Sequence, residues 1–174
     1  FVVDSKALST GQGLLIMKAA DLRDAGVSAE EIVEKVNVLR PYVNTSFVPD
    51  RLDYLYKGGR CSRMAFYGAT LLKFHPLIEM RDGQLTADKK YRGGMVKCIE
   101  QYIDDLAVKY PKYEKTRCFI TNSMADEAVV EAARKKVAEK FSFDEVLETV
   151  AGSVITGHCG RNTLGVLFIA EENE

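Results

Sequence analysis

The run LGVLFIA, Leu164–Ala170, is the stretch of this sequence that most restricts how the chain can fold. It is uncharged and rich in aliphatic and aromatic residues, which predicts a strand buried inside a sheet. The run is far shorter than the roughly 18 residues of a membrane span, so it predicts a protein core. A second apolar run, Ser153–Thr156, predicts a neighbouring strand, and Gly157 and Gly160 enclose His158 in a predicted turn between the two.

The rest of the chain alternates between strand and helix patterns. Further strands are predicted at Phe1–Asp4, Thr45–Pro49 and Arg117–Thr121, and a hairpin turned by Asp82-Gly83 is predicted over 76–90. Apolar residues at helical spacing predict helices over about 12–25, 28–40, 62–72, 93–109 and 125–140, with a helical turn over 51–56.

Two capping-box patterns mark helix starts, Ser28 with Glu31 and Ser142 with Glu145, and the second predicts a further short helix. Strands separated by helices, together with an antiparallel hairpin, indicate an α/β fold. The sequence therefore predicts a mixed β-sheet with packed helices.

The predicted domain boundary lies near Pro41–Asn44. Residues 1–43 form a strand–helix–helix unit too small to cover both faces of its strand, so we expect the remainder of an N-terminal α/β domain. Residues 44–174 are expected to form a C-terminal α/β domain with its own sheet. The chain has no initiator Met and opens on a strand pattern, so we also expect that an upstream part of the protein is missing.

Composition argues against several classes of function. The formal net charge of −1 is inconsistent with a broad basic surface for nucleic acid. The four cysteines form no CxxC pair and there are only two histidines, so no metal site is expected. Reduced, buried thiols and the lack of a signal-peptide pattern predict a cytoplasmic protein without a membrane span.

Two loops are candidates for anion binding. DSKALSTGQG carries Ser5 and Ser9 at a predicted strand-to-helix junction, where backbone N–H groups and hydroxyls favour a carboxylate or phosphate. Simple helix capping is the alternative. KGGRCSR presents Arg60 after a glycine pair, and a solvated arginine at a helix end is an equally consistent interpretation.

Arg92 and His158 are further candidates. Arg92 precedes a predicted helix N-terminus, where a cation opposes the helix dipole, and this indicates a bound anion. His158 is either a functional group or a histidine that satisfies a turn carbonyl. Adjacent residues of an extended chain point to opposite faces, so Cys159 is expected to be buried and inert. The sequence has no paired carboxylates and no nucleotide fingerprint, which favours binding over turnover.

Four blocks of this sequence together resemble the DegV family of bacterial fatty-acid-binding proteins: VVDSKALSTGQG, the GGR block followed by HPLIEMRDGQL, KKYRGG, and VITGHCGRNTLGV. The resemblance implies a two-domain α/β protein that binds a long-chain fatty acid between its domains. It also implies a carrier without turnover or cofactor, which presents the carboxylate to a fatty acid kinase for acyl-phosphate formation in phospholipid synthesis. The family usually opens with about another third of chain.

By the same resemblance, Arg92 and His158 lie near the fatty acid head group or phosphate, and Arg60 belongs to the surrounding polar network. The apolar strand is expected to line the lipid tail, with Val166 pointing toward it. The sequence departs from the family at Cys159, where Thr is common, and at Arg161-Asn162, where the turn often carries Pro-Gly. The alternative from another class is a phosphotransferase or hydrolase that uses His158 and Arg92.

Overall fold

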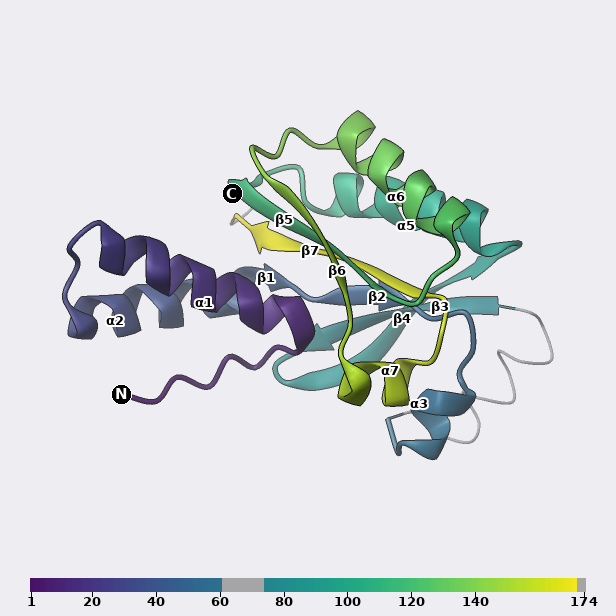
Figure 1. Cartoon of the computed structure of the whole chain (residues 1–174), viewed down its shortest axis with the longest axis horizontal. Coiled ribbons are helices and arrows are strands. Elements are labelled where there is room, and N and C mark those ends of the chain that lie inside the picture. The colour runs from purple at the N-terminus through teal and green to yellow at the C-terminus, as the bar shows by residue number, and fades with distance from the viewer. Residues whose placement is uncertain (61–73, 172–174) are drawn as a thin grey trace.

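The computed structural model describes residues 1–60 and 74–171, which form a mixed β-sheet with helices on both faces (Figure 1). This confirms the predicted α/β fold class. The elements are α1 (Ser9–Asp24), α2 (Ala29–Leu39), η1 (Arg40–Tyr42), β1 (Val43–Asn44), β2 (Ser46–Val48), α3 (Asp53–Lys57), β3 (Phe74–Arg81), β4 (Gln84–Arg92), α5 (Met95–Lys109), β5 (Tyr113–Ser123), α6 (Glu127–Lys140), β6 (Val146–Val150), α7 (Ser153–Cys159) and β7 (Thr163–Ala170).

The strands follow the order β4-β3-β2-β7-β5-β6, and β1 also pairs with β7. Strands β5 and β6 run parallel, and the other described pairs are antiparallel. β7 lies in the interior of the sheet, and all of its residues are buried. The prediction that Leu164–Ala170 is a buried strand is therefore confirmed.

Pairing along β7 is interrupted opposite Val166, because Thr45 separates β1 from β2. Side chains take the place of the missing strand bonds. Nδ2 of Asn44 donates to the Val166 carbonyl oxygen (2.9 Å), and the Val166 N–H donates to the hydroxyl of Tyr102 (3.0 Å). Since Tyr102 belongs to α5, this point joins the helix to the centre of the sheet.

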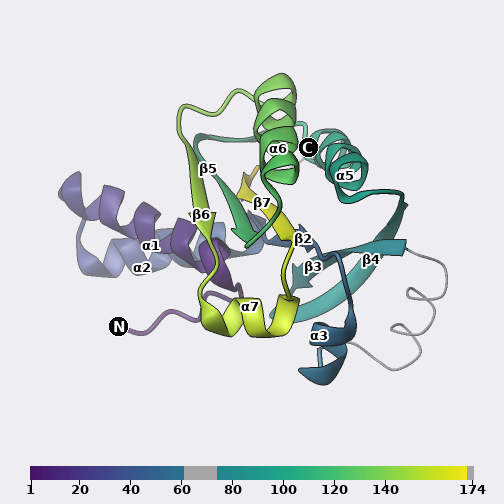
Figure 2. The ribbon, with the colours of Figure 1, turned by 45° about the vertical axis from the view of Figure 1, so that its right-hand side comes forward.

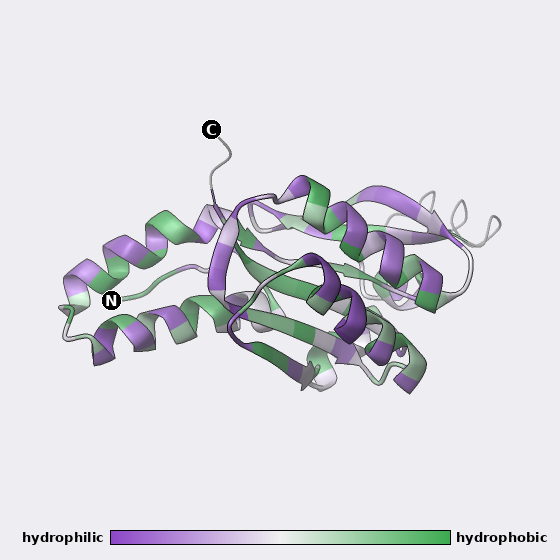
Figure 3. Cartoon of the chain, turned by 90° about the horizontal axis from the view of Figure 1, so that it is seen from above, coloured by the Kyte–Doolittle hydropathy of each residue, from purple (hydrophilic) through white to green (hydrophobic). Residues whose placement is uncertain are grey.

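Helices α5 and α6 cover the first face of the sheet and lie above it in Figure 1. Figure 3 shows that the helices alternate between hydrophobic and hydrophilic residues, as amphipathic helices do. Apolar residues at helical spacing along these two helices are buried: Met95, Ile99, Tyr102, Leu106, Val130, Ala133 and Val137. Val166 packs in this same core. The expectation that Val166 faces a lipid tail is wrong, because its side of β7 is covered by α5.

The second face is covered by two pairs of helices (Figure 2). α1, with α2 beside it, packs on the sheet through Leu14, in a cluster with Leu167 and Ile169 of β7. Farther along this face, Leu55 of α3 and Cys159 of α7 pack together against residues of β2 and β3. No helix of the described residues combines the length and hydropathy that crossing a membrane requires.

Local signals correctly predict two further features. The Ser28 hydroxyl accepts the N–H of Glu31 (3.3 Å) and the Glu31 carboxylate accepts the N–H of Ser28 (3.4 Å), so the first capping box is present. Asp82-Gly83 turns the β3–β4 hairpin, and both residues have positive φ (49° and 79°). This matches the left-handed backbone that a tight hairpin needs.

The strand predicted at Phe1–Asp4 and the short helix predicted from Ser142 are both wrong. Residues 1–4 form no strand, because Phe1 and Val2 are exposed and no strand of the described chain pairs with them. The second capping box starts no helix. Instead, the Ser142 N–H donates to the hydroxyl of Tyr113 (2.7 Å), and the chain continues into β6, which pairs with β5.

The predicted strand Ser153–Thr156 is also wrong, because these residues begin α7. Val154 is 72% exposed, whereas Ile155 and Cys159, four residues apart, both pack toward the core. That spacing is helical, and a run of four residues is too short to reveal it.

Two further predictions remain open. The helix predicted over 62–72 lies outside the described residues. The boundary predicted between residues 43 and 44 falls within β1, which pairs with β7. The division of the chain into the end of one domain and the whole of another stays a prediction.

Candidate functional site

One end of the sheet carries most of the predicted site residues. β2, β4 and β5 finish there, β3 and β7 begin there, and α3 and α7 lie at this end (Figure 2). His158 occupies the last turn of α7, which Gly160 ends with a positive φ of 78°. The expected turn between two strands is therefore wrong. His158 is instead presented by a short helix that leads into β7.

His158 lies against α3. A methyl group on Gly58 would overlap Nδ1 of His158, so the bare glycine makes room for the imidazole. The contact is reciprocal, because the ring of Tyr54 fills the space beside Gly160 in the same way. We term Tyr54, Gly58, His158 and Gly160 the α3–α7 clasp. Nδ1 of His158 is buried and has no hydrogen-bond partner in the described chain, a state that costs free energy until a partner binds.

Arg60 joins this group, whereas Arg92 stands apart. The Arg60 guanidinium donates to the carbonyl oxygen of Gly58 (2.6 Å), so Arg60 and His158 contact the same glycine. Arg92 is exposed at the end of β4. β4 is three positions from β7 in the sheet, which corresponds to about 14 Å at the usual strand spacing. Arg92 thus shares the sheet end with His158 but lies at its edge.

A pocket beside the clasp lies between the first turn of α1, α7 and the second face of the sheet. Its apolar lining is Leu8, Phe47, Ala151, Ile155, Cys159, Gly165 and Leu167, and its polar lining is Ser9, Thr45, Ser46, Thr121, Asn122, Ser123 and Thr163. The cavity volume of about 30 Å³ has room for about one water molecule. α7 therefore presents Ile155 and Cys159 to the pocket and His158 to the clasp.

Hydroxyl groups connect α1 to the sheet at this pocket. Oγ1 of Thr10 is 2.6 Å from Oγ1 of Thr121, which in turn is 2.9 Å from Oγ1 of Thr149. α1 begins without a side-chain cap, and its first residue, Ser9, lines the pocket. Ser5 makes hydrogen bonds within its own loop. Of the predicted anion loop, Ser9 reaches the pocket and Ser5 does not.

The cysteines of the described chain are buried and free. Burial raises the pKa of the Cys159 thiol to about 11 and also raises those of Cys98 and Cys118. Cys159 is therefore buried as predicted, although the argument from an extended chain does not apply to a helix. Cys61 lies outside the described residues. The described residues contain no cluster of metal-ligating side chains.

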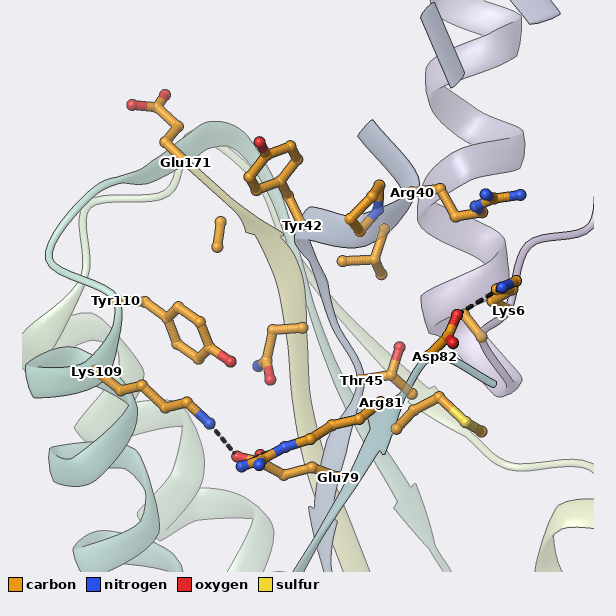
Figure 4. Close-up of a pocket in the computed structure, with 16 residues that line it drawn as sticks. Lys6, Arg40, Tyr42, Thr45, Glu79, Arg81, Asp82, Lys109, Tyr110 and Glu171 are labelled. Atoms are coloured by element: carbon orange, nitrogen blue, oxygen red, sulfur yellow. Dashed lines mark hydrogen bonds and ion pairs between the residues drawn. The ribbon is translucent and has the colours of Figure 1, made fainter. Parts of the chain in front are cut away.

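A larger groove of about 700 Å³ opens at the opposite end of the sheet (Figure 4). In Figure 4, Tyr42 and Arg40 lie across the groove from Tyr110 and Lys109. None of the predicted site residues lines it. Most of its charges are paired within the groove, so it does not form a strongly cationic or anionic site.

Glu79 is the central charge of this groove. Its carboxylate accepts hydrogen bonds from Lys109 (2.6 Å) and Arg81 (2.7 Å). Burial by itself raises the pKa of Glu79, but these two bonds outweigh it and hold the pKa below its ordinary value. A second ion pair, Lys6 with Asp82 (2.5 Å), links the N-terminal segment to the hairpin turn.

Three polar residues beside the clasp were missed by the sequence analysis. Nδ2 of Asn162 donates to Oδ2 of Asp50 (3.4 Å), and Oδ1 of Asp50 lies 3.7 Å from Nδ1 of His75. Asn162 has a positive φ of 59°, a conformation in which Asn is one of the few enriched non-glycine residues. The sequence contained one signal for Asn162, namely that it replaces the glycine that the family often has at this position. Nothing in the sequence places Asp50 opposite it.

Comparison with known proteins agrees with this architecture. A family model described as "Uncharacterised protein, DegV family" matches residues 1–171. The chain belongs to the DegV family. A DegV domain-containing protein of Clostridium acetobutylicum is 30% identical over 168 residues, which is 97% of this chain and 58% of that protein. Another, from Caldanaerobacter subterraneus, is 32% identical over 96% of this chain and 59% of its own length. The chain thus spans about three fifths of these curated DegV relatives.

Solved DegV structures have the same fold. A Thermus thermophilus DegV family protein, described by its fatty acid binding, has a TM-score of 0.86 at 26% identity and covers 98% of this chain and 61% of its own. A Thermotoga maritima DegV lipid-binding protein has a TM-score of 0.83 at 26% identity, with coverage of 100% and 60%. A Streptococcus pneumoniae fatty acid kinase B3 protein loaded with linoleic acid, at 23% identity, TM-score 0.85 and coverage of 98% and 60%, shares the fold.

Proposed function

We propose that this DegV protein binds a long-chain fatty acid and presents its carboxylate to a fatty acid kinase, without turnover of its own. The observation that carries the proposal is the double role of α7. This helix supplies the apolar side chain of Ile155 and the buried Cys159 to the pocket and, within the same turn, supplies His158 with a buried, unpartnered nitrogen. An apolar wall beside one polar group is what a fatty acid requires.

The pocket is one wall of the proposed site. Its volume of about 30 Å³ is far below the roughly 300–1,000 Å³ of small-molecule sites, so most of the tail must be enclosed elsewhere. In the proposal, residues 44–174 form the C-terminal domain, residues 1–43 end the N-terminal domain, and the acid lies between the two. Burying a sixteen-carbon tail supplies on the order of 10 kcal/mol of gross apolar driving force.

The polar end of the site is proposed to be the clasp and its neighbours. His158 and Arg60 meet at Gly58, and we assign both to the network around the head group. Ser9 adds a hydroxyl at the pocket. Arg92 stands on the edge strand β4, three strand positions from β7, and is assigned to the incoming phosphate or the kinase rather than to the carboxylate. The setting in the proposal is cytoplasmic.

Lipid extraction from the whole protein tests the binding step. Denaturing mass spectrometry of an organic extract is expected to show stoichiometric long-chain fatty acid. Ile155→Asp should lower the occupancy at least tenfold, because it sets an unpaired charge against the tail. Val154→Asp is the matched control, since the neighbouring Val154 is 72% exposed and should leave occupancy unchanged. An empty wild-type extract, or equal occupancy in both variants, contradicts the proposal.

Acyl-phosphate formation with the cognate kinase tests the head-group assignments. Arg92→Ala and His158→Ala should retain the bound acid, since tail burial is apolar, and should slow phosphorylation by removing donors that offset developing charge. Full rates in both variants would remove these residues from the site. Turnover of a phosphate ester by lipid-free protein, lost in the same variants, would favour a phosphotransferase or hydrolase instead.

A further inference from the structure

We propose that Asp50 and Asn162 are a positioning pair that sets His158 against α3, a role that rests on the proposed function of His158. The pair joins the loop before α3 to the loop after α7. Each loop flanks a helix that carries one half of the α3–α7 clasp, so their hydrogen bond links the two halves of the clasp. Asp50 lies outside the blocks by which the chain resembles its family, and Asn162 stands where the last block departs from the family pattern.

Asn162 is the more highly connected partner. Its N–H donates to the Ser123 carbonyl oxygen (2.8 Å), and its Oδ1 accepts the N–H of Asp126 at the start of α6 (3.1 Å). Its Nδ2 is then left to donate to Asp50 (3.4 Å). A glycine here would keep the left-handed backbone and the first bond, but it would lose the two side-chain bonds. The Asn side chain therefore adds connections that the common family glycine lacks.

Asp50 lies in the segment between β2 and α3. One carboxylate oxygen meets Asn162, and the other lies 3.7 Å from Nδ1 of His75, which is itself 3.3 Å from the Pro49 carbonyl oxygen. The Asp50 side chain is only 35% exposed, so its bond to Asn162 is partly shielded from water. The carboxylate thus connects the entry to α3 with β3 and with the exit from α7.

The rest of the clasp does not replace this bond. The ring-on-glycine contacts of Tyr54 and His158 are van der Waals contacts without a hydrogen bond between the groups that touch. Oγ1 of Thr163 donates to the Cys159 carbonyl oxygen (2.9 Å), which holds α7 to β7 but not to α3. The Asp50–Asn162 bond is therefore a polar link between the segments that flank the two helices of the clasp.

The test compares Asn162→Gly, Asp50→Ala and the double variant in the whole protein. Two readouts are taken: the ring signals of His158 by NMR, assigned with His158→Gln, and the affinity for palmitate. Each single variant should stay folded, shift the His158 signals and weaken palmitate binding about fivefold to tenfold, the loss expected for one typical hydrogen bond. The double variant should lose less than the sum of the two single variants, because both remove the bond between Asp50 and Asn162.

Two controls separate positioning from general loosening. Met124→Gly also places glycine at a positive-φ site (47°) of this sheet end, and it should leave both readouts unchanged. Asp50→Asn keeps an acceptor for Asn162 and should recover most of the affinity. Unshifted His158 signals in Asn162→Gly, or additive losses in the double variant, overturn the proposal. If wild-type protein binds no fatty acid, the proposed function fails, whereas the NMR readout still decides the positioning role.

Discussion

Bare glycines and rings determine the geometry around His158. Gly58 and Gly160 each leave a space that an aromatic or imidazole ring of the other helix fills. Gly58 has an ordinary helical φ of −75°, so its role is close approach and not backbone freedom. The backbone at this position can accommodate alanine, but the added methyl group would collide with the His158 ring.

Gly58→Ala should therefore displace His158 without removing it. Overpacking at this contact is expected to cost about 1–3 kcal/mol in the free energy of unfolding, measured by urea titration. Gly157→Ala in α7 is the control, because a methyl group there meets no atom within 4 Å. It should be neutral or stabilise by up to about 1 kcal/mol through helix propensity. Equal stabilities of the two variants would show that the His158 ring can move away from the methyl group without a cost in free energy.

At the scale of elements, β3 and α5 are joined by charge at the end far from His158. Glu79 of β3 is 4% exposed. Its carboxylate accepts a hydrogen bond from Lys109, the last residue of α5. Arg81, two residues along β3, provides the second cation. Because the folded state holds the pKa of Glu79 below its ordinary value, the ionised carboxylate stabilises the fold.

Glu79→Gln is expected to lower the free energy of unfolding at pH 7 by about 1–3 kcal/mol, a range reduced because both cations are partly exposed. The pKa of the folded state is depressed, so this stabilisation is present above the ordinary value of 4.5 and is lost as pH falls through the folded pKa. The wild-type and variant curves should converge as pH falls below 4.5 and through the folded-state pKa. Asp88→Asn, at an exposed partner of Arg81, should change little. A difference that grows on acidification contradicts this account.

The whole molecule is organised around β7, which both helical layers sandwich. Tyr102 is fully buried and reaches from α5 to the break between β1 and β2. Its hydroxyl lies 2.8 Å from Oγ of Ser46, donates to the Ser46 carbonyl oxygen (3.0 Å) and accepts the Val166 N–H. Burial raises its pKa, so it stays protonated and keeps these bonds.

Tyr102→Phe should cost about 1–3 kcal/mol of global stability, because it leaves the Val166 N–H buried without a partner. Urea unfolding followed by two probes should show one cooperative transition at lower urea concentration. Tyr42→Phe serves as the control, since Tyr42 is only partly buried and water can solvate its hydroxyl. A loss below about 0.5 kcal/mol for Tyr102→Phe would mean that a water molecule replaces the hydroxyl.

Much of the fold was predictable from the sequence alone. The long helices α5 and α6, the Asp82-Gly83 hairpin, the Ser28 capping box and the buried strand β7 all follow from signals that extend over a turn or more of local chain. Their physical basis is local, because periodic apolar faces, caps and left-handed turn residues favour one conformation before any distant contact forms.

The features that local sequence signals do not predict depend on tertiary contacts. Ser153–Thr156 is too short for its period to be read, and it became a helix because Ile155 and Cys159 could then both face the core. The segment after Ser142 became a strand because β5 offered an edge to pair with. The meeting of His158 with Gly58, and of Asn162 with Asp50, joins residues about a hundred positions apart. Such contacts depend on how the elements pack, and packing is a property of the whole chain rather than of any local stretch.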